Sequence, residues 1–185
     1  AVTAHGTRRF TSDEVWRMAA SGLLESRDRF ELLDGELVYV SPQDPPHAIA
    51  IARLCQVLTF AYGPAFLVRP QLPISGIADS IPEPDLAVVP ASTGPAPTHP
   101  TAGEAVLLVE VCDTSRARDQ QKAAIYATAG AAEYWILDVS HRTFDVHRGP
   151  LADGGWRSVE RLDAHICIPL PALEVKISLQ QILGV

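Results

Sequence analysis

The chain has 185 residues, 47% of them hydrophobic and 20% charged, a composition that is ordinary for a globular protein and a length that suits one sizeable α/β domain. Its formal net charge of −7 repels a polyanion, so a nucleic-acid partner would require a locally basic surface or a bound metal ion. No segment approaches the roughly 18 apolar residues of a membrane span, and residues 1–10 lack the apolar core of a signal peptide, so we expect a cytoplasmic protein with no membrane contact.

The N-terminal region predicts a helix followed by a hairpin. The segment TSDE at residues 11–14 is a capping box, and the helix that it begins should end at Gly22. Two apolar runs over residues 29–42 flank an Asp-Gly pair, the strongest short-range signal for a hairpin turn. Glu31 and Glu36 are expected on the solvent side of these strands, although Glu31 could also reach a site from an adjacent strand.

A longer helix is predicted between the proline pair at residues 45–46 and the Gly-Pro pair at residues 63–64. His47 lies at its start, where a histidine is usually a polar surface residue but could also contribute to a site. The side chains expected to face the core are Ile49, Ala52, Leu54, Cys55, Leu58 and Ala61.

Two further strands are predicted in the middle of the chain. Residues 66–70 form a short strand, and a second one covers residues 86–89. Pro84 favours extended geometry in the chain next to it, which leaves Asp85 at the entrance of the second strand. An acid at such an entrance is often only a turn or cap residue. Residues 91–104, rich in Pro, Gly and Thr, form a loop.

The stretch Glu104–Asp138 predicts a buried strand, a helix and a second buried strand. Glu110 lies within the apolar first strand, and a buried carboxylate is costly unless a metal ion or a cation compensates it. Residues 113–115 offer caps at the start of the helix, and Gly130 ends it. The helix carries Lys122, one of only two lysines among 15 basic residues, which suggests a role that arginine cannot fill.

The remaining chain predicts antiparallel strands, with turns near Gly149-Pro150 and at residues 153–155, and a short terminal helix. There are no internal repeats and there is no domain boundary, so residues 1–185 are expected to form one domain, with residues 1–28 as an N-terminal helical extension. The cysteines are odd in number and far apart, which fits neither a disulfide framework nor a zinc pair, and they are expected to be small core side chains: Cys55, Cys112 and Cys167.

Three of these residues form a candidate site. Asp85 and Glu110 are expected on neighbouring strands, and a 3.6-residue period places Asp119, Lys122 and Tyr126 on one face of the helix that follows. That face can therefore lean over the end of the Glu110 strand.

The chemistry of this group is that of a metal site. Two carboxylates with a backbone carbonyl suit Mg²⁺, with Mn²⁺ as a substitute, and a nearby lysine could orient or deprotonate a metal-bound water. Those parts suffice for metal-assisted phosphodiester hydrolysis. The structural alternative is that Glu110 pairs with Lys122 or an arginine in a buried ion pair, while Asp85 is a turn residue.

Several spaced segments resemble one family. The runs PEPDLAVV and LLVEVCDTSRARDQQKAAIYATAGAAEYWILD are similar to the Uma family of putative restriction endonucleases, which belongs to the PD-(D/E)XK nuclease superfamily. FELLDGELVYVSPQDPPHAIA resembles the N-terminal half of that family, and IPLPALEVKISL its C-terminal strand. The similarity covers most of the chain from Phe30 onward.

The resemblance implies roles for individual residues. Asp85 matches the acid of the PD motif and Glu110 the acid of the (D/E)XK motif, while Lys122 matches the lysine that this family carries on the following helix. The superfamily's usual lysine position, two residues after Glu110, is Cys112 here. Tyr126 and the segment GAAEYWILD match positions that look structural, and His47 matches a family histidine.

One segment departs from the family pattern. After the glutamate the family has a turn similar to Leu-Ser-Pro-Ser, whereas this chain has Cys112 followed by Asp-Thr-Ser at residues 113–115. The aspartate adds negative charge near the candidate metal site.

The resulting hypothesis is an α/β protein with a restriction-endonuclease-like core, a central mixed β-sheet flanked by helices, and additional antiparallel strands. It predicts a Mg²⁺-dependent endonuclease that acts on DNA, with Asp85 and Glu110 as metal ligands and Lys122 as the third catalytic residue. Glu31, His47 and Tyr126 are candidate supporting residues. Homodimerisation is expected because cutting both strands of a duplex favours paired sites. The alternatives are a catalytically inactive nuclease fold used for binding or assembly, and a hydrolase of small phosphoesters.

Overall fold

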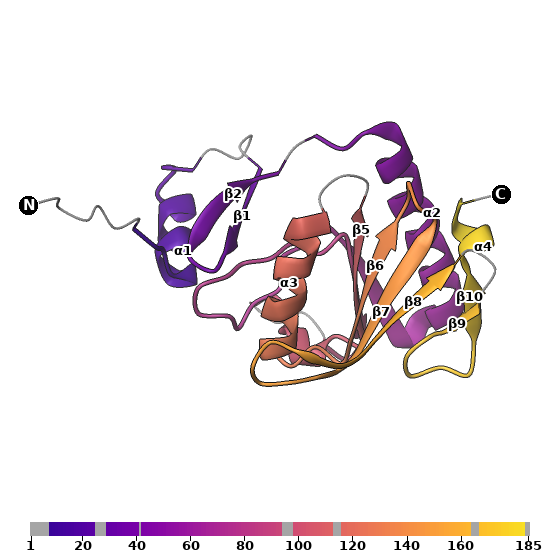
Figure 1. The fold of residues 1–185 in the computed structure, drawn as a ribbon. Helices are drawn as coiled ribbons and strands as arrows, with labels where there is room; N and C mark the ends of the chain where they lie inside the picture. The colour runs from indigo at the N-terminus through magenta and orange to yellow at the C-terminus, as the bar shows by residue number, and fades with distance from the viewer. Residues whose placement is uncertain are drawn as a thin grey trace, which may run out of the picture.

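A six-stranded mixed sheet forms the centre of the computed structural model (Figure 1). The structure describes residues 8–24, 29–40, 42–93, 98–112, 116–163 and 167–183. Its strands lie in the order in which they follow one another in the chain: β3 (Phe66–Pro70), β4 (Leu86–Pro90), β5 (Leu107–Cys112), β6 (Glu133–Asp138), β7 (Thr143–Pro150) and β8 (Trp156–Asp163). Only β5 and β6 pair in parallel, and the helix α3 (Arg116–Thr128) makes the crossover between them. This is the central mixed sheet with flanking helices that the sequence predicts.

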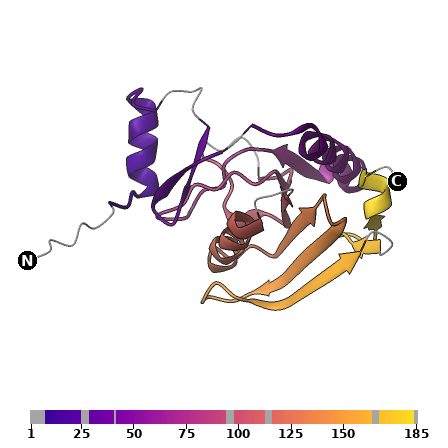
Figure 2. The ribbon, with the colours of Figure 1, turned by 45° about the horizontal axis from the view of Figure 1, so that its top comes forward.

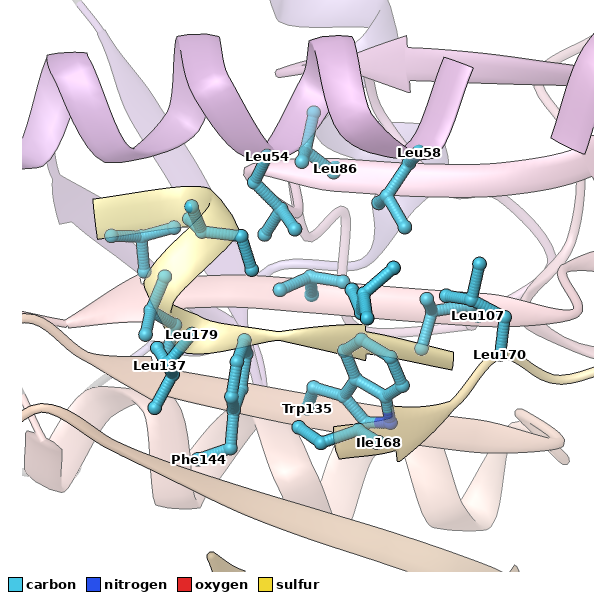
Figure 3. Close-up of a cluster of buried hydrophobic side chains, with 14 of the residues drawn as sticks. Leu54, Leu58, Leu86, Leu107, Trp135, Leu137, Phe144, Ile168, Leu170 and Leu179 are labelled. Carbon is cyan, nitrogen blue, oxygen red and sulfur yellow. The ribbon is translucent and has the colours of Figure 1, made fainter. Parts of the chain in front are cut away.

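The two faces of the sheet are covered by different helices (Figure 2). The long helix α2 (Pro45–Tyr62) packs Leu54 and Leu58 on one face, together with Trp135 and Phe144 of the sheet and the terminal helix α4 (Leu179–Leu183) (Figure 3). The other face packs against α3. Since side chains alternate along a strand, Leu107, Val109 and Val111 of β5 face α2, whereas Leu108 and Cys112 face α3. Glu110 has the parity of the second group, so it belongs to the α3 face.

The N-terminal part forms a smaller unit beside the sheet. Helix α1 (Ser12–Ala20) and the hairpin of β1 (Phe30–Leu33) and β2 (Glu36–Tyr39) share a core of Val15, Leu32 and Ile81. Gln121 of α3 donates a hydrogen bond to the Asp34 carboxylate at the hairpin turn, with Nε2 and Oδ2 2.8 Å apart. The hairpin is therefore held against α3.

Short elements complete the described fold. The 3₁₀ helices η1 (Gly63–Ala65) and η2 (Ala102–Glu104) precede β3 and β5, and the small antiparallel pair of β9 (Cys167–Pro169) and β10 (Lys176–Ser178) precedes α4.

Most of the predicted elements are confirmed. Thr11 caps α1 through the capping box with Glu14, α2 ends at Gly63, and β6 and the C-terminal strands are present. Asp34 and Gly35 both have positive φ, 49° and 81°, as the type I′ hairpin turn requires.

Other expectations were wrong. Glu31 is only 2% exposed, because the second face of the hairpin is covered by the main body of the protein instead of solvent. β7 continues through Pro150, so the single turn before β8 lies at residues 151–155. Cys167 is exposed, although Cys112 is buried as predicted.

The helical phase of α2 was also predicted wrongly in part. Ile49 is 52% exposed and Ala52 is exposed, because the buried stripe includes their neighbours instead. That stripe consists of Ala50, Ile51, Leu54, Leu58 and Tyr62.

One helix of the described residues is long and apolar enough to cross a membrane by length and composition alone. It spans Pro45–Ala65 and thus includes α2, and 28% of its most apolar window is buried. The core helix of a soluble protein passes the same test, and α2 packs on the sheet through Leu54 and Leu58, both 0% exposed.

Candidate active site

A pocket of about 340 Å³ lies where the hairpin, the start of α2, the segment before β4, the end of β5 and the start of α3 meet. All three residues predicted to be catalytic line it, as do Glu31 and His47. Its acidic lining residues are Glu31, Asp44, Glu83, Asp85, Glu110 and Asp119. The structure therefore brings these five residues to one pocket, together with acidic residues for which the sequence predicted no role: Asp44, Glu83 and Asp119.

Asp85 connects the ends of β4 and β5. It directly precedes β4, and its Oδ2 accepts a hydrogen bond from the backbone N–H of Val111 in β5 at 2.8 Å. Its Oδ1 accepts from Gln71 Nε2 at 3.3 Å. Asp85 is 8% exposed, and this network of donors fixes its carboxylate at the mouth of the strand.

Glu110 is held between a lysine and a tyrosine of α3. Its Oε1 accepts hydrogen bonds from Lys122 Nζ at 2.9 Å and from the Tyr126 hydroxyl at 3.0 Å. Burial raises the pKa of Glu110 well above its ordinary value; the positive charge of Lys122 opposes this rise, and Asp85 and Glu31 add to it. Tyr126, which the sequence placed on the Lys122 face of α3, thus contacts the site through Glu110.

Lys122 has a carboxylate on either side. Its Nζ lies 2.7 Å from Glu31 Oε1 and 2.9 Å from Glu110 Oε1, and the Glu83 carbonyl is 3.5 Å away. Burial alone would lower the pKa of Lys122, but the charges of Glu110 and Glu31 outweigh that effect and raise it. These two carboxylates favour the protonated form of Lys122, which places a positive charge between Glu31 and Glu110.

Glu31 also belongs to this group, although the alternating pattern of the hairpin predicted that its side chain faces solvent. Besides its contact with Lys122, its Oε1 accepts a hydrogen bond from the backbone N–H of Glu83 at 2.7 Å. The hairpin thus contributes a buried carboxylate to the site from a part of the chain 79 residues away from Glu110. The sequence offered one signal for it, since Glu31 lies in the segment FELLDGEL that resembles the family.

His47 and Asp119 complete the polar lining. His47 lies in the first turn of α2, where its backbone N–H donates to the Asp44 carboxylate, and its Nε2 lies 3.4 Å from Asp85 Oδ2. The nearby Asp85 carboxylate raises the pKa of His47 against the effect of burial. Asp119 is 4% exposed, and its Oδ2 has no hydrogen-bond partner among the described residues. Burial raises the pKa of Asp119 to about 6, opposed by Lys122 and by a hydrogen bond with Cys112. The sequence assigned no role to Asp119 beyond its helix face.

Comparison with models of known protein families shows the family to which the chain belongs. A family model described as "Uma2: Putative restriction endonuclease" matches residues 13–181. The chain belongs to the Uma2 family.

The fold of this Uma2 protein is shared by a solved structure. The crystal structure of a putative nuclease belonging to DUF820 from Anabaena variabilis superimposes with a TM-score of 0.78 at 18% sequence identity, over 95% of this chain and 98% of the other. The crystal structure of the type IIG restriction endonuclease BpuSI matches over 75% of this chain and 15% of the other, at 16% sequence identity and with a TM-score of 0.42. No curated protein matches the chain.

The pocket contains carboxylate oxygens, which are the donor type that a hard divalent cation prefers. Within the described residues there is no group of three or more His, Cys, Asp and Glu side chains arranged around a metal position. Mg²⁺, however, is commonly bound through one or two carboxylates and keeps several waters. Glu110 Oε2 accepts no hydrogen bond from the described residues, and Val111, which offers a backbone carbonyl, lines the same pocket. Residues 113–115, where the chain departs from the family pattern, lie outside the described residues.

Proposed function

We propose that this protein is a Mg²⁺-dependent endonuclease that hydrolyses phosphodiester bonds in DNA, with Mn²⁺ as a substitute ion. The observation that carries the proposal is that Asp85 and Glu110, at the ends of adjacent strands, line one pocket together with Lys122. Membership of a family of putative restriction endonucleases supports the nuclease class. DNA is the substrate that the family description favours.

In this proposal, Asp85 and Glu110 would hold the divalent ion, which would supply Lewis-acid chemistry to the phosphate and to a bound water. Lys122 keeps its proton and supplies a positive charge next to Glu110. Tyr126 fixes the orientation of the Glu110 carboxylate by donating to Oε1, and Val111 does the same for Asp85 through its backbone N–H. These positioning contacts leave the carboxylates rigid before substrate arrives, which is how preorganised sites gain rate.

The test is cleavage of supercoiled plasmid and of linear DNA in Mg²⁺ or Mn²⁺, with RNA as a parallel substrate, by the parent and by Asp85→Asn and Glu110→Gln. Both substitutions are nearly isosteric. Gln keeps one oxygen for Lys122 and Tyr126, which both donate to Oε1 of Glu110, whereas Asn keeps an oxygen for one of the two donors to Asp85, such as the backbone N–H of Val111. We expect each variant to lose activity by about 100-fold or more, because a ligand contributes at least as much as the outer-shell groups whose loss costs 10–100-fold. Glu36→Gln, at an exposed position of β2, is the matched control and should retain full activity.

Activity that persists in Asp85→Asn and Glu110→Gln would contradict the site assignment. Titration of the parent with Mn²⁺, followed calorimetrically, tests metal binding separately from catalysis. A parent that binds no divalent ion and cleaves nothing would instead support the non-catalytic alternative.

That alternative, a nuclease fold used for binding or assembly, has one observation in its favour. Six acidic side chains line the pocket, and the only lysine there is already paired with two of them. A buried ion network of this kind can serve structure alone. A hydrolase of small phosphoesters would also accommodate the net charge of −7, since a small substrate needs no extended basic surface.

We further propose that two copies act together, because cleavage of both strands of a duplex favours paired sites. Sedimentation of the protein with and without a short duplex measures this. A monomer in both conditions would contradict it.

A further inference from the structure

The residues discussed so far leave the pocket with an excess of negative charge. Its six carboxylates face an anionic phosphodiester, and Lys122 is occupied by Glu31 and Glu110. A divalent ion would offset part of this negative charge but would not hold the substrate on either side of the reacting phosphate. Two further cations line the pocket, Arg29 and Arg118, and neither was predicted to have a role.

Arg29 stands at the entrance to β1, on the hairpin side of the pocket. Its side chain is exposed, and its backbone carbonyl pairs with the N–H of Val40. The guanidinium makes no ion pair or hydrogen bond with any residue that the structure describes. It nevertheless lies close enough to the carboxylates to act on them: burial and Glu31 raise the pKa of Glu83, and Arg29 is the strongest influence opposing that rise.

Arg118 occupies the first turn of α3, on the wall that carries Asp119 and Lys122. It is half-buried and, like Arg29, its guanidinium has no ion pair or hydrogen bond with the described part of the chain. Its charge also reaches into the pocket, since it is among the groups that oppose the burial-driven rise in the pKa of Asp119.

Arginines without a partner beside so many carboxylates are unusual, because the nearest acids would ordinarily pair with them. The carboxylates of this pocket pair with Lys122, with backbone N–H groups and with the polar side chains of Gln71 and Tyr126 instead. Both guanidinium groups thus keep all five of their donors available in a planar arrangement that matches phosphate oxygens.

We propose that Arg29 and Arg118 bind backbone phosphates of the DNA substrate from two walls of the pocket and position the phosphodiester over Asp85 and Glu110. This inference rests on the proposed function and adds the substrate-binding residues to it. It also places two positive charges at the pocket for contacts with phosphates, in a chain whose net charge is −7.

The experiment measures binding of a fluorescently labelled duplex by anisotropy over a series of salt concentrations, in Mg²⁺, with the full chain carrying Glu110→Gln to prevent cleavage. Arg29→Gln and Arg118→Gln are compared in this background. Each should weaken binding roughly tenfold, as expected for the loss of a charge-assisted hydrogen bond, and should reduce the slope of log K against log salt concentration by about 0.9. Arg157→Gln is the matched control, because Arg157 is exposed on β8 and lies outside the pocket lining.

The outcomes separate the two proposals. If the parent binds DNA while both arginine variants keep its affinity and its salt slope, the roles of Arg29 and Arg118 are refuted and the proposed function stands. If the parent binds no DNA, both proposals fail. Because neither guanidinium has a partner in the described fold, the unfolding midpoints of both variants should match that of the parent, so weaker binding cannot be attributed to misfolding.

Discussion

Replacing Lys122 by methionine tests whether the lysine is required to compensate the buried carboxylates. Met is similar in length and volume but carries no charge. In the variant, Glu31 and Glu110, which are 2% and 3% exposed, lose the cation that lies 2.7 and 2.9 Å from them. Breaking a buried pair by removing one partner costs about 3–5 kcal/mol, because the remaining charge is left uncompensated. That is a large part of the roughly 5–15 kcal/mol of stability of a typical domain.

The destabilisation should depend on pH in a definite direction. Burial already raises the pKa of Glu110 in the folded state, and Lys122 opposes that rise. Without Lys122 the folded-state pKa rises further above the unfolded value, so the native state binds more protons than the unfolded state between these two values. The free energy of unfolding then increases as the pH falls through this window. The deficit of Lys122→Met should therefore be largest near pH 8 and smaller near pH 5.

The measurement is urea unfolding followed by far-ultraviolet circular dichroism at both pH values. Lys176→Met is the matched control, because Lys176 is the only other lysine of the chain and is exposed on β10. Adding Glu31→Gln and Glu110→Gln to Lys122→Met removes the uncompensated charges and should restore most of the lost stability. A Lys122→Met protein within about 1 kcal/mol of the parent at pH 8 would refute the reasoning, since exposed substitutions commonly stay within such a range.

Two other substitutions give distinct expectations. Asp119→Asn removes a carboxyl group whose pKa burial raises to about 6. Ionisation of this group in the folded state is therefore unfavourable, and the resulting loss of stability is small at pH 4 and fully present well above pH 6. The variant should unfold at a higher urea concentration than the parent at pH 8 but at nearly the same one at pH 4, and equal differences at both pH values would contradict the raised pKa. Tyr126→Phe removes the hydroxyl that donates to Glu110 at 3.0 Å and should lower the free energy of unfolding by about 1 kcal/mol. Because this contact positions a catalytic carboxylate, kcat on a short duplex should fall more than KM changes.

The parts of the fold that depend on local signals could be read from the sequence. The capping box at Thr11, the Asp-Gly turn and the apolar alternation of β5 act over a few residues, and so they predict α1, the hairpin and the parity of Glu110. The 3.6-residue period of α3 then brings Lys122 and Tyr126 to the same carboxylate.

The residues that could not be predicted depend on how distant elements pack. Glu31 sits at a position that is solvent-facing in an isolated hairpin, and it becomes buried only because the hairpin docks beside α3. The phase of α2 has the same origin, since an apolar helix offers several stripes and the sheet selects one of them. The direction of the pKa shift of Lys122 also depends on distant packing. The rarity of lysine does not predict it, whereas the carboxylates of Glu31 and Glu110, which come from the hairpin and from β5, raise that pKa.

The acidity of the chain leads to a last prediction about binding. A nuclease with a broad basic surface and six phosphate contacts loses about a thousandfold in duplex affinity between 50 and 200 mM salt. The pocket described here offers two unpaired guanidinium groups, Arg29 and Arg118. Two contacts give a slope of about −1.8 and a loss of only about 12-fold over the same range. Anisotropy titrations of the Glu110→Gln protein at these salt concentrations measure the slope directly. A slope steeper than about −4 would mean that most of the phosphate contacts lie outside this pocket.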